Sequence, residues 1–220
     1  DNRFQTPLPP RDMKTTALFL LTALTITSLF AQTTSIDSPD RHIGISLHNG
    51  NGADAGSWFL TVNDKRSDRP IVSIPRISLG LSFADKDLST NLRLVNSSAP
   101  KKITENYTAL HGKRSHCTNA ATEIVATFEN AKRSRMDVRI RAYNDGLAFR
   151  YELPRGTGTT MVMDERTSYE IPGDALRWLE PWTPGNENLY SALRTDSVQR
   201  DWGLPALFCP ADTSVWFLIH

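Results

Sequence analysis

The chain has 220 residues, of which 39% are hydrophobic and 22% are charged, and its formal net charge is +1 at pH 7. This length is sufficient for a hydrophobic core without crosslinks. The basic residues are spread along the chain and form no strongly positive segment, so a nucleic-acid partner is not expected.

The segment of residues 13–31 has the features of a secretory signal peptide. A lysine follows Met13, an apolar run extends over residues 17–30, and Ala31 precedes the expected cleavage point. This order is typical of a cleaved leader, and the apolar run is short for a membrane span. We expect a periplasmic or secreted protein that is not attached to a membrane after cleavage. Residues 1–12 precede the first methionine and are expected to be extraneous to the mature protein.

Residues 32–220 are expected to form an all-β domain. Short stretches of alternating apolar and polar residues are separated by turn residues, and no window of eleven residues has a helical period. The stretches include "RHIGISLHNG", "GSWFLTVNDKR", "PIVSIPRISLGLSF" and "EIVATFEN". Consecutive hairpins of this kind predict a large antiparallel sandwich.

The stretch "RAYNDGLAFRYELP", residues 141–154, predicts a hairpin with a tight turn. A two-residue loop of Asp145 and Gly146 would place Ala142 opposite Phe149, and every apolar residue would then face another. A three-residue loop from Asn144 to Gly146 would mix the two faces. We therefore expect a type I′ turn with positive φ at Asp145 and Gly146, where a valine would destabilise the fold.

In this register the outer face of the hairpin carries several charges. Arg141 would face Arg150, which is unfavourable unless a carboxylate lies nearby, and Arg139 would face Glu152. Arg139 and Arg141 belong to the most basic stretch of the chain, "NAKRSRMDVRIR". We interpret this stretch as a solvated strand face in preference to a phosphate site.

The two cysteines, Cys117 and Cys209, leave two possibilities open. Export would permit a disulfide between them, and two buried free thiols are equally compatible with a domain of this size. Neither cysteine has the neighbours of a metal-binding motif.

Aromatic and acidic residues alternate in the segment "DERTSYEIPGDALRWLEPWTPGNENLYSALRTD". It contains Trp178, Trp182 and Tyr190 among carboxylates, with proline and glycine between them. Flat aromatic rings can stack on sugars, and carboxylates can bind hydroxyl groups or a hard cation. The alternative is that Trp178 and Trp182 fill the core at a sheet edge.

The order of "RISLGLSF", "ENYTALHGKRSH", "RIRAYNDGLAFRYELP", "DERTSYEIPGDALRWLEPW" and "NENLY" resembles the amino-terminal domain of glycoside hydrolase family 97. This is a family of calcium-dependent α-glucosidases and α-galactosidases of Bacteroidota, and the resemblance extends from about residue 38 to residue 220. It implies an antiparallel β-super-sandwich of the galactose-mutarotase type, followed by a (β/α)8 barrel. Alternation continues through "SVWFLIH" at the end of the sequence, so we expect a domain truncated before that barrel.

The resemblance also implies where the chemistry lies. The catalytic carboxylates and most calcium ligands of the family lie on the barrel, so no catalytic residue is expected in this chain. One glutamate of the amino-terminal domain completes the calcium site, and Glu187 in "NENLY" matches it. Calcium is therefore expected as a cofactor only of the full-length enzyme. The family usually carries a larger residue than Asn186 before this glutamate.

Two functions are compatible with these observations. The first is the non-catalytic domain of an exported calcium-dependent α-glycosidase that acts on α-linked oligosaccharides, shapes the pocket and presents Glu187. The alternative is a stand-alone carbohydrate-binding module that uses Trp178, Trp182, Tyr190 or Trp202. A free-standing mutarotase is less well supported, because the histidines do not have the spacing of a catalytic histidine and carboxylate pair.

Overall fold

Most strands form where apolar and polar residues alternate along the chain.

The computed structural model describes residues 34–66, 71–155, 161–185, 187–194, 201–211 and 215–220, which all belong to one compact unit. The expected leader, residues 13–31, and the extraneous residues 1–12 lie outside the described residues. Within the described part of the chain, no helix has the length and hydrophobicity of a membrane span.

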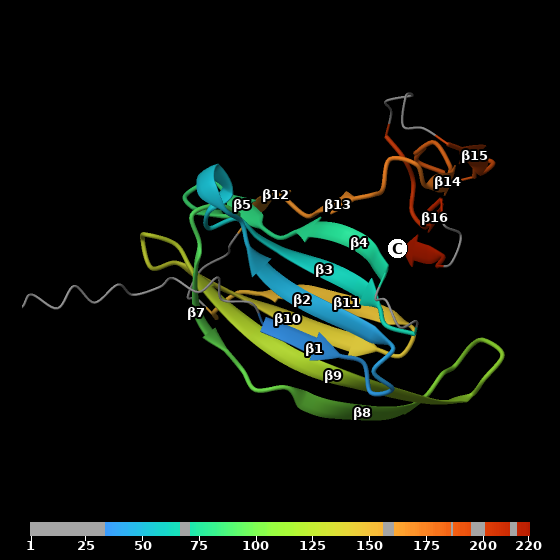
Figure 1. Ribbon diagram of the computed structural model, residues 1–220, viewed down its shortest axis with the longest axis horizontal. Helices are drawn as coiled ribbons and strands as arrows, with labels where there is room; N and C mark the ends of the chain where they lie inside the picture. The colour runs from blue at the N-terminus through green and yellow to red at the C-terminus, as the bar shows by residue number, and fades with distance from the viewer. Residues whose placement is uncertain (1–33, 67–70, 156–160, 186, 195–200, 212–214) are drawn as a thin grey trace, which may run out of the picture. The chain divides into compact units, whose positions relative to one another are not determined.

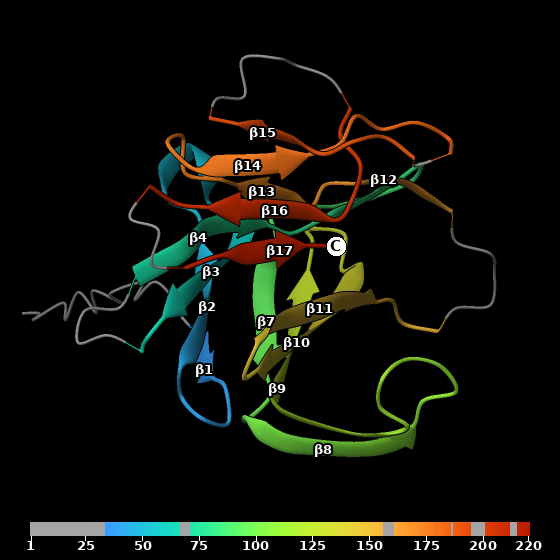
Figure 2. The ribbon, with the colours of Figure 1, turned by 90° about the vertical axis from the view of Figure 1, so that its right-hand side faces the viewer.

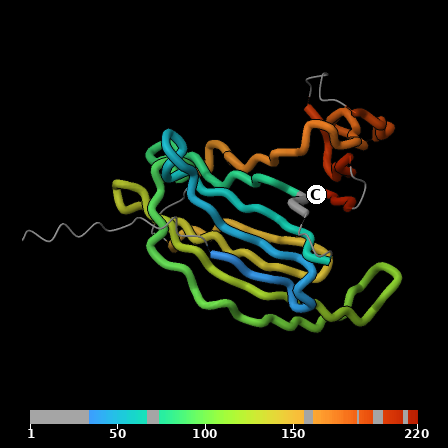
Figure 3. The backbone as a smooth tube through the Cα atoms, in the orientation of Figure 1, coloured from blue at the N-terminus to red at the C-terminus, as the bar shows by residue number. Residues whose placement is uncertain are grey.

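Two five-stranded sheets carry most of the fold, and every strand pair in them is antiparallel. The first sheet has the order β1 (Thr34–Asp37), β2 (Ile43–Asn49), β3 (Trp58–Asp64), β4 (Ile71–Ser78) and β13 (Ser168–Glu170), with a short 3-10 helix, η1 (Gly52–Asp54), between β2 and β3. The second sheet has the order β11 (Gly146–Glu152), β10 (Arg135–Tyr143), β9 (His116–Glu129) and β7 (Arg93–Ser97), and β8 (Lys101–Thr108) also pairs with β9. Figure 3 shows β7 and β8 in green along the length of β9.

Two smaller antiparallel sheets complete the described structure. The third sheet consists of β12 (Val162–Glu165), β5 (Leu81–Phe83) and β6 (Asp87–Leu88). The fourth sheet has the order β15 (Ser191–Leu193), β14 (Leu176–Leu179), β16 (Ala206–Cys209) and β17 (Phe217–Ile219), and Figure 2 shows these strands side by side.

The main core lies between the first and second sheets, which Figure 1 shows as neighbouring layers. Trp58 of β3 contacts Phe128 of β9, with ring centroids 5.1 Å apart. Leu60, Ile77 and Ile140 are fully buried in the same hydrophobic cluster. Their positions alternate with outward-facing residues, which is the pattern of two antiparallel sheets packed face to face. The expected all-β antiparallel sandwich is therefore confirmed.

The β10–β11 hairpin differs from the register that the sequence predicts. Its two-residue loop is Asn144 and Asp145, with Tyr143 paired to Gly146, so that Ile140 lies opposite Phe149. Ala142 therefore faces Leu147 and not Phe149. The shift is two residues along β11, so every side chain keeps its face and the alternation cannot distinguish the two registers.

The expected type I′ turn is also wrong. No residue of the loop has a positive φ, and Gly146 begins β11 in an extended conformation with nothing within 4 Å of an added Cβ. A long-range contact holds the observed loop, because the Asp40 backbone N–H donates to Asn144 Oδ1 at 3.1 Å.

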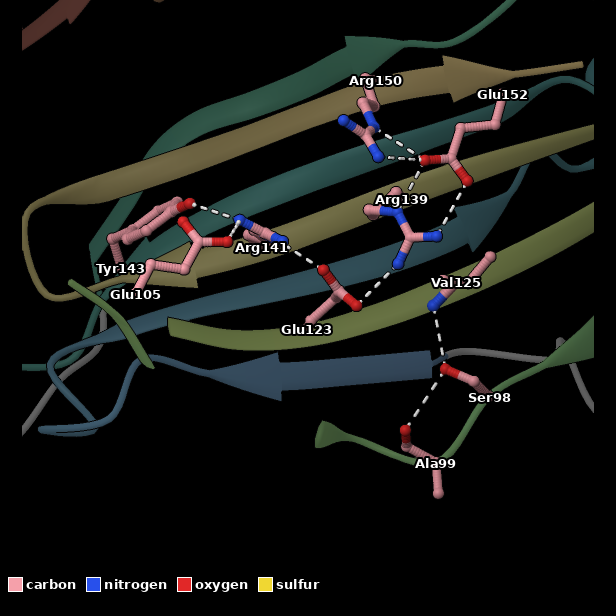
Figure 4. Close-up of polar contacts among 10 residues, drawn as sticks. All are labelled: Ser98, Ala99, Glu105, Glu123, Val125, Arg139, Arg141, Tyr143, Arg150 and Glu152. Carbon is pink, nitrogen blue, oxygen red and sulfur yellow. Dashed lines mark hydrogen bonds and ion pairs between the residues drawn. The ribbon is translucent and has the colours of Figure 1, made fainter. Parts of the chain in front are cut away.

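The outer face of the second sheet carries a cross-strand ion-pair network (Figure 4). Arg150 lies opposite Arg139, whereas the register predicted from the sequence placed it opposite Arg141. Arg139 donates to Glu152 and, from Nη1, to Glu123 Oε1 at 2.7 Å. Arg141 donates from Nε to the other oxygen of Glu123, also at 2.7 Å. The carboxylates thus offset the repulsion of neighbouring arginines, and the basic stretch forms an ion-paired strand face.

The arginines keep the carboxyl groups of this network ionised. Hydrogen bonds from Arg139 are the largest cause that lowers the pKa of Glu152, to about 2, with Arg150 contributing. Burial opposes ionisation of Glu123, but the hydrogen bonds and charges of Arg141 and Arg139 outweigh it and lower its pKa. The native state therefore holds protons on these groups less tightly than the unfolded chain does.

Acid should weaken the fold through this network. Because the folded pKa of Glu152 is below its unfolded value, its contribution is complete above about pH 5 and is lost as the pH falls toward about 2. Urea unfolding at pH 7 and pH 3 should show a lower free energy of unfolding at pH 3. Glu152→Gln should lose less stability between these pH values than the wild type. Equal losses in the two proteins would contradict the assignment.

Two glycines should respond oppositely to substitution. Gly56 has φ +84°, and a Cβ there would lie 2.6 Å from the Cα of Asn91, so Gly56→Ala should cost about 1–3 kcal/mol of stability. Gly146→Val should change stability by less than about 0.5 kcal/mol, because its conformation and surroundings accept a side chain. Thermal or urea unfolding of both variants measures this. A large loss in Gly146→Val would contradict the observed turn, and an unchanged Gly56→Ala would contradict the close approach of Gly56 to Asn91.

Candidate functional site

The predicted site residues lie on the fourth sheet and on the segment that joins β14 to β15. Trp178 is in β14, where it is half-buried and stacks on Trp216 with ring centroids 5.0 Å apart and an interplanar angle of 25°. Its strand neighbours on the same face are Ala192 and Leu207. Trp178 therefore covers this face of the sheet and does not fill the main core.

Residues 180–190 carry the other predicted residues, and this segment is tied to residues 201–205. The Trp182 backbone N–H donates to the Asp201 carbonyl oxygen at 2.9 Å, and the Tyr190 hydroxyl donates to the Pro205 carbonyl oxygen at 2.9 Å. Trp182 is 56% exposed and Tyr190 is 43% exposed. Trp182 is thus not a core residue. The two rings lie on one segment at the edge of the fourth sheet.

Glu187 is exposed on the same segment. No ion pair joins it to another described residue. The side-chain amide of the neighbouring Asn188 donates to the Pro181 carbonyl oxygen at 3.1 Å and to Thr183 Oγ1 at 2.9 Å. The backbone beside Glu187 is thereby held in place while its carboxylate stays open to solvent.

The described residues do not form a complete metal site. Among them, no group of three or more histidine, cysteine, aspartate or glutamate side chains could hold a metal ion. Ca²⁺ requires six to eight oxygen ligands, and Glu187 can supply a carboxylate of the right chemical type. Its chemistry fits one position of a calcium site, and the remaining ligands would have to come from elsewhere.

Two buried charged residues flank or belong to this segment: Arg177 in β14, which was not singled out from the sequence, and Glu180 at the first position of the segment. A cleft of about 500 Å³ is lined by Trp202, Leu204 and Phe208 together with Arg177. Arg177 is 4% exposed; its Nη2 donates to the Pro172 carbonyl oxygen at 3.3 Å, and its Nη1 has no hydrogen-bond partner among the described residues. Glu180 is 3% exposed, and its Oε1 also lacks a described partner.

Unsatisfied buried polar atoms are costly, at about 1–3 kcal/mol each, so these two groups are suited to receive a partner. The sequence does contain a signal for Arg177. In the short apolar strand β14, Arg177 and Leu179 are two residues apart and therefore lie on the same face, which is the buried side of the sheet.

Both cysteines are free thiols in the described structure. Cys117 is half-buried on β9 and Cys209 is buried on β16. Of the two possibilities left open by the sequence, the structure shows free thiols, with no disulfide between Cys117 and Cys209.

Comparison with known proteins identifies the family. The model of the family described as Glycosyl-hydrolase 97 N-terminal matches residues 36–220. The chain belongs to this family. The expected resemblance to family 97 is therefore confirmed over nearly all of the described structure.

Relatives of this Glycosyl-hydrolase 97 N-terminal chain are much longer than it is. It is 32% identical over 184 residues to a probable retaining alpha-galactosidase of Streptomyces bingchenggensis (strain BCW-1). The alignment covers 81% of this chain and 28% of that protein. The chain thus spans less than a third of the length of this curated relative.

Solved structures share the fold. A beta-arabinopyranosidase superposes with a TM-score of 0.74 at 23% identity, over 85% of this chain and 31% of its own. A family 97 enzyme from Pseudoalteromonas sp. strain K8, solved in complex with panose, has a TM-score of 0.67 at 19% identity, over 81% of this chain and 27% of its own. The same enzyme has also been solved with acarbose.

Substitution of two tryptophans distinguishes a surface ring from a core ring. Trp182→Ala should change the free energy of unfolding by less than about 0.5 kcal/mol, because the ring is mostly in solvent. Trp58→Ala should cost about 3–5 kcal/mol, because it removes a buried ring from between the two large sheets. Urea unfolding measures both. A comparable loss in Trp182→Ala would mean that the ring has a structural role.

Proposed function

We propose that this chain is the non-catalytic amino-terminal domain of an exported, calcium-dependent α-glycosidase. The observation that carries the proposal is the family match over residues 36–220, combined with a curated alpha-galactosidase relative of which this chain spans 28%. In this proposal the catalytic carboxylates lie on a domain encoded after His220. The apolar run of residues 17–30 supports export.

The proposed task of the domain is to shape one wall of the substrate pocket and to present Glu187. The exposed carboxylate stands on a backbone segment that Asn188 and the contacts to residues 201–205 hold in place. Such fixed placement lowers the entropic cost of joining a metal site formed with another domain. Bound calcium would supply Lewis-acid polarisation of a substrate oxygen.

The proposed substrate of the whole protein is an α-linked oligosaccharide. A structural relative of the same family has been solved with panose and with acarbose, which supports a saccharide ligand. Trp182 and Tyr190 offer exposed rings on the segment of Glu187, where a sugar ring could stack. Trp178, half-covered by Trp216, would contribute less.

Exposed aromatic rings also favour a second candidate, a carbohydrate-binding module that acts without a catalytic domain. The affinity of this chain alone for panose distinguishes a binding module from a supporting domain. Saturable binding that is lost in Trp182→Ala and retained in a matched surface variant, Tyr107→Ala, would favour the binding module. Undetectable binding would favour the supporting domain.

The chain by itself should hydrolyse no glycoside, whereas the longer protein should. Aryl α-galactosides and α-glucosides in the presence of calcium are suitable substrates, and heat-denatured protein is the control. A gene that continues past His220 into a second domain, with activity only when both parts are present, is the expected result. Turnover by the isolated chain that is lost on heating would refute the non-catalytic role.

A further inference from the structure

A cleft of about 600 Å³, lined by charged and hydroxyl side chains together with Trp58 and Leu79, lies away from the Glu187 segment, where β4 and β13 adjoin the third sheet. Figure 1 shows β13 beside β4 and β12 beside β5. The charged residues that line this cleft are Arg76, Arg166 and Asp87. Hydroxyl side chains form most of the remaining lining: Ser57, Ser78, Ser82, Ser89, Thr90 and Ser168.

Arg76 is held in one orientation at this cleft. Its guanidinium lies over the ring of Phe59, 4.4 Å from the centroid, and its Nε donates to Ser78 Oγ at 3.2 Å. Within the described ranges, no carboxylate forms an ion pair with Arg76 and its two terminal nitrogens have no hydrogen-bond partner. Glu170 lies opposite Arg76 in the β4–β13 register, but it is exposed and outside ion-pair distance. The terminal N–H groups are therefore available to a ligand.

The acceptors at the cleft are largely occupied. Asp87 Oδ1 accepts hydrogen bonds from the Ser89 backbone N–H at 2.9 Å and from Ser89 Oγ at 2.6 Å, and its Oδ2 accepts from Thr90 Oγ1 at 2.8 Å. Both oxygens of Asp87 are thus engaged within the chain, whereas the terminal N–H groups of Arg76 are not.

Arg166, the second arginine at the cleft, is less available to a ligand than Arg76. Arg166 pairs through Nε with Asp164 Oδ2 at 3.0 Å, and both side chains are about half in solvent. Arg166 adds positive charge near the cleft, while Arg76 has no such competitor. Arg76 is thus the residue best placed to bind a negative group.

We propose that this cleft binds an oxyanion, a phosphate, sulfate or carboxylate group, with the guanidinium of Arg76 as its main contact. A planar guanidinium fixed by stacking and by one hydrogen bond can offer two parallel N–H groups to two oxygens of such a group. The hydroxyls of Ser57, Ser78, Ser82 and Ser168 do not donate to Asp87, unlike those of Ser89 and Thr90, and can donate further hydrogen bonds to the oxyanion. A neutral sugar would fit less well, because it would leave the guanidinium of Arg76 without a charged partner. This site is independent of the proposed role of Glu187.

The test is a calorimetric titration of the full chain with inorganic phosphate at low ionic strength. The wild type should bind one equivalent, and Arg76→Gln should weaken binding by about tenfold or more. Arg114→Gln, which removes the same charge from the exposed β8–β9 loop, should bind as the wild type does. Glu170→Gln should tighten binding by removing a negative neighbour.

Arg76→Lys guards against an effect on folding, since it keeps the charge and loses the planar fork. It should give an affinity between those of the wild type and Arg76→Gln, and thermal melts should show that all variants are folded. Equal phosphate affinity in the wild type and Arg76→Gln, or no saturable binding at all, would overturn the proposal.

Glucuronate and glucose separate the possible sources of the oxyanion. Tighter binding of glucuronate than of phosphate would show that the group is carried on an acidic sugar, and the reverse would indicate a free anion. Glucose bound as tightly as glucuronate, with no loss in Arg76→Gln, would mean that the cleft recognises hydroxyl groups and would contradict the assignment.

Discussion

The apolar contact between the two large sheets determines most of what the domain can do. Trp58 of β3 meets Phe128 of β9, and the inward residues of β4 and β10 pack around them. Burial of such rings and branched side chains is the main stabilising term in a domain of this size. Because side chains alternate along a strand, this interface also fixes which residues lie on the two outer faces.

Each outer face uses charged residues in a different way. On the second sheet, Arg139 and Arg141 share the buried carboxylate of Glu123, so positive and negative groups satisfy one another. On the first sheet, Arg76 rests on Phe59 and faces a cleft lined with hydroxyl groups, without a described carboxylate partner. The first arrangement stabilises strand pairing, and the second leaves donors for a ligand.

The fold class could be predicted from the sequence because alternation with period two is a local signal. The exact pairing of the β10–β11 hairpin could not, because a shift of two residues keeps every side chain on its face. The observed loop depends on a hydrogen bond from Asp40 to Asn144, which are 104 residues apart in the chain. A contact of this range has no local sequence signature.

The candidate site, too, could be predicted from the sequence only in part. The segment with Trp182, Glu187 and Tyr190 could be located because aromatic, acidic and turn residues are concentrated in it. Arg177 and Arg76 were not singled out, because their importance depends on burial and on missing partners that only the packed strands define. The role of Glu187 as a calcium ligand stays a prediction.

The relation to family 97 unites the fold with the proposed function. The chain spans 28% of its curated relative, and the proposed function assigns it an exposed, well-anchored group that joins a site on another domain. Glu187 has this character, since its neighbour Asn188 fixes the backbone and its carboxylate remains open. Arg177, in β14, and Glu180, at the start of the same segment, are both buried and incompletely bonded among the described residues.

The most direct test of this account is the calcium dependence of activity in the longer protein that is proposed to join this chain to a catalytic domain. Activity should be titrated against calcium for the wild type, for Glu187→Gln and for Glu165→Gln, an exposed glutamate on β12 that serves as a matched control. The account predicts that only Glu187→Gln lowers the maximum activity and raises the calcium concentration required for half of it. Superimposable curves for all three proteins would contradict it and leave Glu187 an ordinary surface carboxylate.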